Sequence, residues 1–140
     1  MATRSMIAYE VSTDPLYPQV LAIYCHNDGY PRHNGRILLD HYNTPEKVAK
    51  LMELGHLSLL GNEIGEKQDF DQPTDRNWCL AYGRDRGETF QHAAKFLSLA
   101  EAISNFDECD WFYYYNGEYW KYRTYKGDWG ILTDSACENW

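Results

Sequence analysis

Apolar and polar residues alternate along two stretches near the N-terminus. These stretches are "MIAYEV" (residues 6–11) and "QVLAIYCH" (residues 19–26), both rich in residues that favour strands. Between them, "STDPLYP" contains Asp14-Pro15 and Pro18, which favour turns. The pattern therefore predicts a β-hairpin over residues 6–26.

Two helical patterns follow. In "HNGRILLDHY" (residues 33–42), Asn34 is placed to cap a short helix. Its expected inner face consists of Ile37, Leu38, His41 and Tyr42. A second helix is expected from Pro45, with Thr44 as its N-cap and Gly55 as its end.

The middle of the chain is more polar. Residues 61–77 carry Gly, Pro and charged residues and predict an exposed loop. We expect a short strand in "WCLAYG" (residues 78–83), a loop in "RDRGETFQHAA" and a further strand in "KFLSL" (residues 95–99). The pair Ser98 and Glu101 fits a capping box and predicts a helix over residues 99–106.

The C-terminal pattern is aromatic. "DWFYYYNGEYWKYRTY" (residues 110–125) has Asn116-Gly117 at its centre, which predicts a β-hairpin, and residues 129–133 add one more strand. The elements together predict one α+β domain spanning residues 1–140. We expect an antiparallel β-sheet with two to three short helices packed on one face.

The chain is acidic. Its formal net charge is −8 at pH 7, and residues 101–140 hold 8 acidic and 3 basic residues. Such a surface repels phosphate backbones, so we expect no direct nucleic-acid binding and favour a partner with a basic surface. In the simpler alternative, the charge only keeps the protein soluble.

Cysteine usage and hydropathy indicate a cytoplasmic protein. No apolar run is long enough for a membrane span, and the first residues lack the apolar core of a signal peptide. The cysteines form no C-x-x-C pair, so we expect buried free thiols and no cofactor. They are Cys25, Cys79, Cys109 and Cys137.

One polar stretch, "YCHNDGYPRHNG" (residues 24–35), is a candidate site. His26, Asp28 and His33, with His41 beyond them, are residue types that bind zinc or iron. Their spacing matches no ligand motif, and the alternative is a loop in which residues 27–29 form a turn.

A second candidate is "GRDRGE" (residues 83–88). Two arginines near a glycine are able to bind a phosphate or carboxylate, whereas the alternative is a salt-bridged loop that pins a strand to its neighbours. If the two stretches meet, they form one polar pocket. Its residues would be Tyr24, His26, Asp28, Tyr30, His33, Asn34, Arg84, Asp85 and Arg86.

The aromatic hairpin is a candidate interface. If one face of the sheet is solvated, alternate side chains of the hairpin point outward, and Tyr, Trp and Arg often anchor protein interfaces. The alternative is a sheet stabilised by cross-strand aromatic pairs. The predicted interface residues are Asp107, Glu108, Asp110, Tyr114, Glu118, Tyr119, Trp120 and Asp128.

Several strings occur together in this chain. They are the Met-Ala-Thr-Arg-Ser start, "YCHNDGYP" with "HNG", "LLDHY", "PEKVAKLMELG", "EIGEK" and "YGRDRGE". On these strings the chain resembles a family of small bacteriophage proteins over most of residues 1–88. It departs from the family at Asn27, where an aromatic residue is usual, and in a longer first hairpin. The resemblance implies a phage accessory protein and assigns no catalytic residue.

Two hypotheses follow. The first is a phage protein of the host cytoplasm that binds and inhibits a host defence or nucleic-acid-processing protein (anti-CRISPR or anti-restriction type) through its acidic, aromatic surface. It is a binder rather than an enzyme. The second is a protein for a small ligand, either a nucleotide or a metal, or a small hydrolase. It would use residues 24–35 with residues 84–88, with His26 as general base and Asp28 orienting it.

Overall fold

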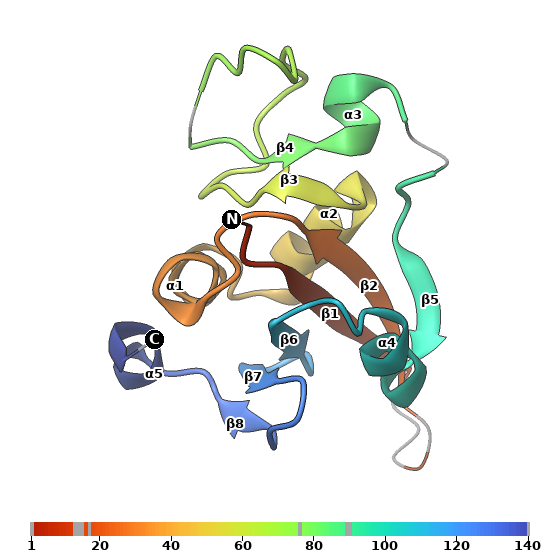
Figure 1. Cartoon of the computed structure of the whole chain (residues 1–140), viewed down its shortest axis with the longest axis vertical. Coiled ribbons are helices and arrows are strands. Elements are labelled where there is room, and N and C mark those ends of the chain that lie inside the picture. Colours follow the sequence, from red (N-terminus) through yellow and green to blue (C-terminus); the bar gives the residue numbers. More distant parts are fainter. Residues whose placement is uncertain (1, 13–15, 17, 76, 89–90, 140) are drawn as a thin grey trace.

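The N-terminal hairpin is the centre of a single sheet (Figure 1). The computed structural model describes residues 2–12, 16, 18–75, 77–88 and 91–139. Within it, β1 (Ser5–Ser12) and β2 (Gln19–Cys25) pair antiparallel, which confirms the predicted hairpin. Asp14-Pro15 of the predicted turn lies outside the described residues.

The C-terminal strands extend the sheet beyond β1. β6 (Trp111–Tyr115) pairs with β1 in parallel and with β7 (Trp120–Thr124) antiparallel. The predicted hairpin is confirmed, and its connection spans residues 116–119, in which Gly117 has φ 99°. β8 (Gly130–Ile131) pairs with β7 and completes this side.

The edge of β2 away from β1 has two neighbours. β5 (Lys95–Ser98) pairs antiparallel with the first half of β2, and β3 (Leu57–Leu59) pairs in parallel with its end. β3 carries β4 (Leu80–Ala81). The sheet is thus mostly antiparallel, with the order β4-β3-β2-β1-β6-β7-β8 and β5 beside β2.

Helices cover both faces of this sheet (Figure 1). Residues of α1, α2 and α5 pack on the face that contains Ile7 and Ile23, whereas α4 packs on the face that contains Met6 and Ala8. The helices are therefore not confined to one face. Their bounds are α1 (Arg36–His41), α2 (Pro45–Leu54), α3 (Tyr82–Arg86), α4 (Leu99–Asn105) and α5 (Asp134–Asn139).

The strand β6 is buried on both sides. Tyr113 and Tyr115 face the core under α1 and α2, whereas Phe112 and Tyr114 face the core under α4. This arrangement follows from the parallel pairing with β1, which makes β6 an internal strand. The aromatic residues of β6 thus form core rather than surface.

The α+β class is confirmed, and so are several local signals. The Thr44 side chain accepts a hydrogen bond from Lys47 N–H, and Ser98 and Glu101 form the expected capping box. The four cysteines are buried and free. β3, α3 and α5 were not predicted. In the part of the chain that the structure describes, every helix falls short of the length and apolarity that a membrane span requires.

Candidate ligand-binding cleft

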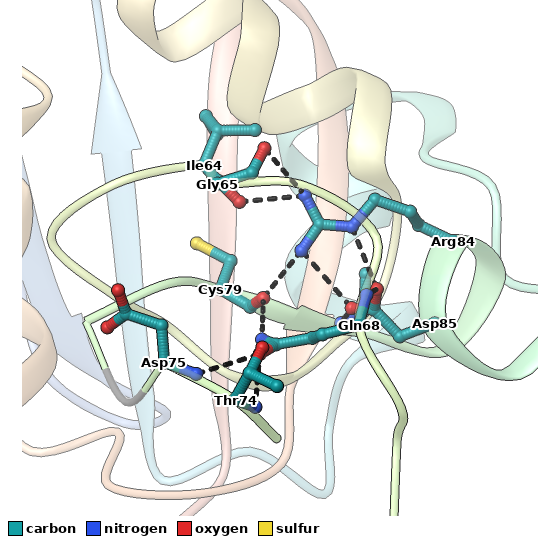
Figure 2. A network of polar contacts seen from close by, with 9 residues as sticks. Ile64, Gly65, Gln68, Thr74, Asp75, Cys79, Arg84 and Asp85 are labelled. Carbon is teal, nitrogen blue, oxygen red and sulfur yellow. Dashed lines mark hydrogen bonds and ion pairs between the residues drawn. The ribbon is translucent and has the colours of Figure 1, made fainter. Parts of the chain in front are cut away.

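The arginines of "GRDRGE" point in different directions from α3. Arg84 turns toward residues 61–79, where its Nη1 donates to the carbonyl of Ile64 at 2.7 Å and to that of Gly65 at 3.3 Å (Figure 2). Its Nη2 donates to the carbonyl of Cys79 at 2.7 Å. Both Nε and Nη2 also donate to the carboxylate of Asp85. All five N–H groups of Arg84 are therefore engaged.

The Asp85 carboxylate closes the same network. Its side chain has no exposed area, and it accepts the backbone N–H groups of Gln68 at 3.0 Å and Ala81 at 2.8 Å. The Gln68 side chain in turn accepts N–H groups of Thr74 and Asp75 (Figure 2). Arg84 and Asp85 thus hold a loop against a strand, which agrees with the alternative of a salt-bridged loop, and Arg84 has no N–H group left for an anion.

Arg86 points to the other side of α3. Its guanidinium carbon lies 4.8 Å from the ring centroid of Phe70 and 4.6 Å from that of Tyr82, and it forms an ion pair with Glu88. Phe70 belongs to the loop that Arg84 holds. The network around Arg84 therefore also positions Phe70, one of the two rings that contact the Arg86 guanidinium.

Arg86 lines a cleft of about 420 Å³ between α3 and the end of α4. The rings of Tyr24 and Phe106 line it together with the buried His56. The other lining residues are Tyr82, His92, Lys95, Asn105 and Glu108. A volume of this size lies within the range of about 300–1,000 Å³ that is typical of small-ligand sites.

Backbone hydrogen bonds bring distant residues together at the cleft. The N–H of His56 donates to the carbonyl of His92 at 2.7 Å, and the N–H of Tyr82 donates to the carbonyl of His56. Gly55 makes this approach possible, because a Cβ atom there would lie 2.1 Å from the His92 carbonyl oxygen and its φ is +74°. His56, Tyr82 and His92 therefore converge although they are far apart in sequence.

The tautomer of His56 is assigned from its neighbour. The N–H of Tyr24 donates to Nδ1 of His56 at 3.0 Å, so the ring proton is on Nε2. Burial lowers the pKa of His56 from its ordinary value of 6.5 to about 4, and the nearby His92 and Lys95 add to the shift. His56 is therefore neutral at physiological pH.

Tyr24 is the link between the cleft and the "YCHNDGYPRHNG" stretch. Its hydroxyl hydrogen-bonds with Nδ1 of His26 at 2.7 Å. Burial raises the pKa of Tyr24 to about 12, although the nearby Arg4 acts in the opposite direction. The Nε of Arg4 is buried without a hydrogen-bond partner among the described residues, and none of their ion pairs involves Arg4.

Charged side chains of both signs meet at the cleft. Its lining contains the cations Arg86 and Lys95 and the carboxylate of Glu108, and the Glu88 carboxylate pairs with Arg86 and lies 3.6 Å from Nε2 of His92. No family model, curated protein or solved structure matches this chain. The site combines cations, which are able to bind an anion, with aromatic rings, which are able to bind a planar group.

The rest of the predicted polar pocket is dispersed. Asp28 accepts a hydrogen bond from the hydroxyl of Tyr30 at 3.1 Å and has φ 57°, in the turn that was expected at residues 27–29. Asp28 and His33 line a separate hollow of about 340 Å³ beside Trp78. Of the nine residues predicted for one pocket, Tyr24 and Arg86 share the cleft, and His26 contacts it through Tyr24.

Asn34 has a different role from the predicted helix cap. It lies in a π-helical turn, Pro31–Gly35, and is completely buried. Its amide nitrogen donates to Ser5 Oγ and Asn27 O, each at 3.3 Å. The side chain therefore ties the loop to the edge of the hairpin, because a π turn continues directly into α1 and leaves no helix start at Asn34.

The histidines proposed as metal ligands lie in separate surroundings. His26 contacts Tyr24, His33 contacts Asn34 at 2.8 Å, and His41 is exposed rather than part of the inner face of α1. Among the residues that the structure describes, no three His, Cys, Asp or Glu side chains are grouped so that they could hold a metal ion.

The predicted protein interface is only partly at the surface. Tyr114 is 6% exposed and Trp120 is 1% exposed, so their predicted interface role is wrong. Both lie in internal strands, and the Trp120 indole donates to the Tyr42 carbonyl at 2.8 Å. The six remaining residues are exposed: Asp107, Glu108, Asp110, Glu118, Tyr119 and Asp128.

Most of the cleft was not predicted from the sequence. His56, Tyr82, His92, Lys95, Asn105 and Phe106 carry no recognisable motif. Tyr82 alone had a signal, since it directly precedes "GRDRGE". Their convergence depends on strand pairings between distant parts of the chain.

Proposed function

We propose that this protein binds a small anionic ligand in the cleft between α3 and α4. The observation that carries the proposal is the lining itself. Arg86 and Lys95 stand beside aromatic rings in one cavity of a chain whose net charge is −8. Arg4 acts electrostatically on Tyr24 and adds to the positive potential there, and its buried Nε has no hydrogen-bond partner among the described residues.

The pKa values of two cleft residues favour ligand binding over catalysis. Tyr24 has a pKa of about 12 and His56 has a pKa of about 4. A general acid or base works best when its pKa is near the working pH, and both values lie far from it. His56 also uses Nδ1 as a structural acceptor. We therefore favour a ligand-binding protein over a hydrolase.

The resemblance to small bacteriophage proteins suggests a setting for this proposal. A phage protein that binds a nucleotide tightly acts as a sponge for a nucleotide signal of the host. Such a protein needs a cleft and no catalytic group. The proposal thus joins the phage origin with the second of the two sequence hypotheses.

Inhibition of a host protein is a second candidate function. Exposed acidic residues gather at one end of the β6–β7 hairpin, since Trp111 pairs with Thr124 there. Asp107, Glu108 and Asp110 precede this end, and Asp128 follows it. This acidic end suits a basic partner, and its binding should weaken as salt concentration increases.

Calorimetric titration with AMP, GMP, inorganic pyrophosphate and citrate tests the first proposal. We expect at least one of these anions to bind, and Arg86→Ala and Lys95→Ala to weaken it by about tenfold or more, because each removes a charged hydrogen-bond donor. At about 100 times its dissociation constant, the ligand should also stabilise the fold by about 2.7 kcal/mol.

Lys126→Ala is the matched control, because Lys126 is exposed in the turn after β7, outside the cleft lining. Its affinity should equal that of the wild type. If none of the four anions binds, or if all three variants weaken binding equally, the proposal is wrong. In that case, specific capture of a basic host protein at low salt, lost in Asp107→Asn/Asp110→Asn, would support the second candidate.

A further inference from the structure

One hydrogen-bond donor in the cleft is fixed before any ligand binds. Since Nδ1 of His56 accepts the N–H of Tyr24, Nε2 carries the proton. No described residue accepts a hydrogen bond from Nε2, although His56 lines the cleft and is 8% exposed. Its pKa of about 4 keeps the ring neutral. His56 therefore offers one N–H to an acceptor atom of a ligand.

Aromatic rings surround this donor. The ring centroid of His56 lies 6.2 Å from that of Tyr24 and 6.1 Å from that of Phe106, both with edge-to-face geometry. The His92 ring is 5.8 Å away. A group that reaches Nε2 is thus flanked by rings, which favour a flat aromatic partner. A heterocyclic base has both flat faces and acceptor atoms at its edge.

The cations of the cleft suit a phosphate. Arg86 uses Nε and Nη2 to bind Glu88, and its Nη1 has no partner among the described residues. The Nζ of Lys95 lies 5.8 Å from the ring centroid of Phe106, and no ion pair between described residues involves it. Lys95 and the N–H groups of Arg86 that Glu88 does not engage are charged donors of the kind that bind phosphate oxygens.

The α4 side of the cleft carries acceptors instead. The Asn105 side chain donates to the carbonyl of Glu101 at 2.8 Å, which leaves its amide oxygen as an acceptor. Glu108 contributes a carboxylate to the same lining. Acceptors of this kind bind hydroxyl and amino groups, which sugars and bases carry and inorganic phosphate lacks. A simple anion would therefore leave this side unused.

We propose that the ligand of the cleft is a nucleotide, whose phosphate is bound by Arg86 and Lys95 and whose base accepts a hydrogen bond from Nε2 of His56. Asn105 and Glu108 would bind the sugar hydroxyls or an amino group of the base. The inference rests on the proposed anion-binding function. The cavity of about 420 Å³ suits one nucleotide rather than an oligonucleotide.

The test compares complete and partial ligands by calorimetric titration at one salt concentration. The probes are the 5′-monophosphates of adenosine, guanosine, cytidine and uridine, the four nucleosides, ribose 5-phosphate and inorganic phosphate. We expect at least one nucleotide to bind at least tenfold more tightly than ribose 5-phosphate, phosphate or its own nucleoside.

The variant His56→Asn distinguishes an effect on recognition of the base from an effect on folding. The Asn side-chain oxygen is able to replace Nδ1 as acceptor for the N–H of Tyr24. The Asn amide nitrogen then takes the position of Cδ2 of the ring, so its N–H groups do not reach the position of Nε2. We expect this variant to weaken the preferred nucleotide by about tenfold and to leave ribose 5-phosphate unchanged. Glu108→Gln, at an exposed position, provides a second variant that folding does not limit. It should weaken the nucleoside, which has no phosphate for the Glu108 carboxylate to repel.

Each outcome decides between the proposals. If ribose 5-phosphate or phosphate binds as tightly as every nucleotide, the base is not recognised, and the nucleotide inference is wrong while anion binding stands. If His56→Asn weakens nucleotide and ribose 5-phosphate equally, or if Glu108→Gln leaves the nucleoside unaffected, the assigned contacts are wrong. If none of the phosphorylated probes binds, anion binding itself is not supported.

Discussion

Arg84 and Arg86 lie two residues apart on α3 and have opposite surroundings. Arg84 is enclosed by three backbone carbonyls and the buried carboxylate of Asp85 (Figure 2). Arg86 is exposed and lies on the rings of Phe70 and Tyr82, with the half-buried Glu88 as its ion-pair partner. Among the described residues, all five N–H groups of Arg84 have acceptors, whereas three N–H groups of Arg86 have none, and Arg86 lines the cleft.

This contrast shows why an arginine motif alone does not define an anion site. A guanidinium binds a ligand only if the protein has not already used its N–H groups. In the five-residue helix α3, Arg84 has a structural role, whereas Arg86 keeps N–H donors that no described residue uses. The two sides are nevertheless linked, because the loop held by Arg84 supplies Phe70 to Arg86.

The largest effect should follow from removing the buried charge of Asp85. Asp85→Asn leaves the Arg84 guanidinium largely enclosed and without its counterion, and we expect the free energy of unfolding to fall by about 3–5 kcal/mol. Urea denaturation measures this change. A loss below about 1 kcal/mol would mean that the loop is not held by this pair and that the contrast between the two arginines is not real.

A smaller effect should appear as pH decreases. Since the pKa of His56 is about 4 when folded and near 6.5 when unfolded, the unfolded chain binds a proton between these values that the native chain does not. The contribution of His56 to stability is complete above pH 6.5. It should decrease by up to about 3 kcal/mol as pH falls to 4.

Urea denaturation at several pH values, compared between wild type and His56→Asn, isolates this contribution. The variant lacks the titrating group, so its stability should depend less steeply on pH over the same interval. Parallel curves for the two proteins would show that His56 is solvated in the native state and is not the fixed donor described above.

The smallest effect is expected at Glu88. Glu88→Gln removes a solvent-accessible ion pair with Arg86, so we expect little change in stability. The freed guanidinium should bind AMP a few-fold more tightly, as calorimetric titration would show. If the affinity decreases instead, Glu88 orients Arg86 for the ligand rather than competing with it.

The elements predicted correctly are those with signals that are local in sequence. Thr44 and Gly55 bound α2, Ser98 with Glu101 begins α4, and Asn116-Gly117 turns between β6 and β7. Each signal depends on backbone geometry within a few residues. The hairpins and the α+β class follow from such signals together with alternation.

The features that the sequence did not predict depend on distant pairings. The internal position of β6 follows from its parallel pairing with β1, which buries Tyr114 on the second face. The cleft depends on the contact of His56 with His92, which Gly55 permits. No local pattern encodes either contact. The short helix α3 lacks a side-chain cap, and the sequence instead predicts a strand up to Gly83 and a loop from Arg84.

The parallel pairing of β1 with β6 also has a kinetic consequence. Ser5 pairs with Trp111 and Tyr9 with Tyr115, so the ends of this contact are separated by most of the chain. Contacts of high sequence separation cost loop-closure entropy before they stabilise anything, and they slow folding. During synthesis, β1 and β2 are made long before β6, so the edge of β1 that pairs with β6 stays unpaired until then. Assembly of the sheet should therefore be late and cooperative, and the hairpin with this open edge is the species most exposed to aggregation.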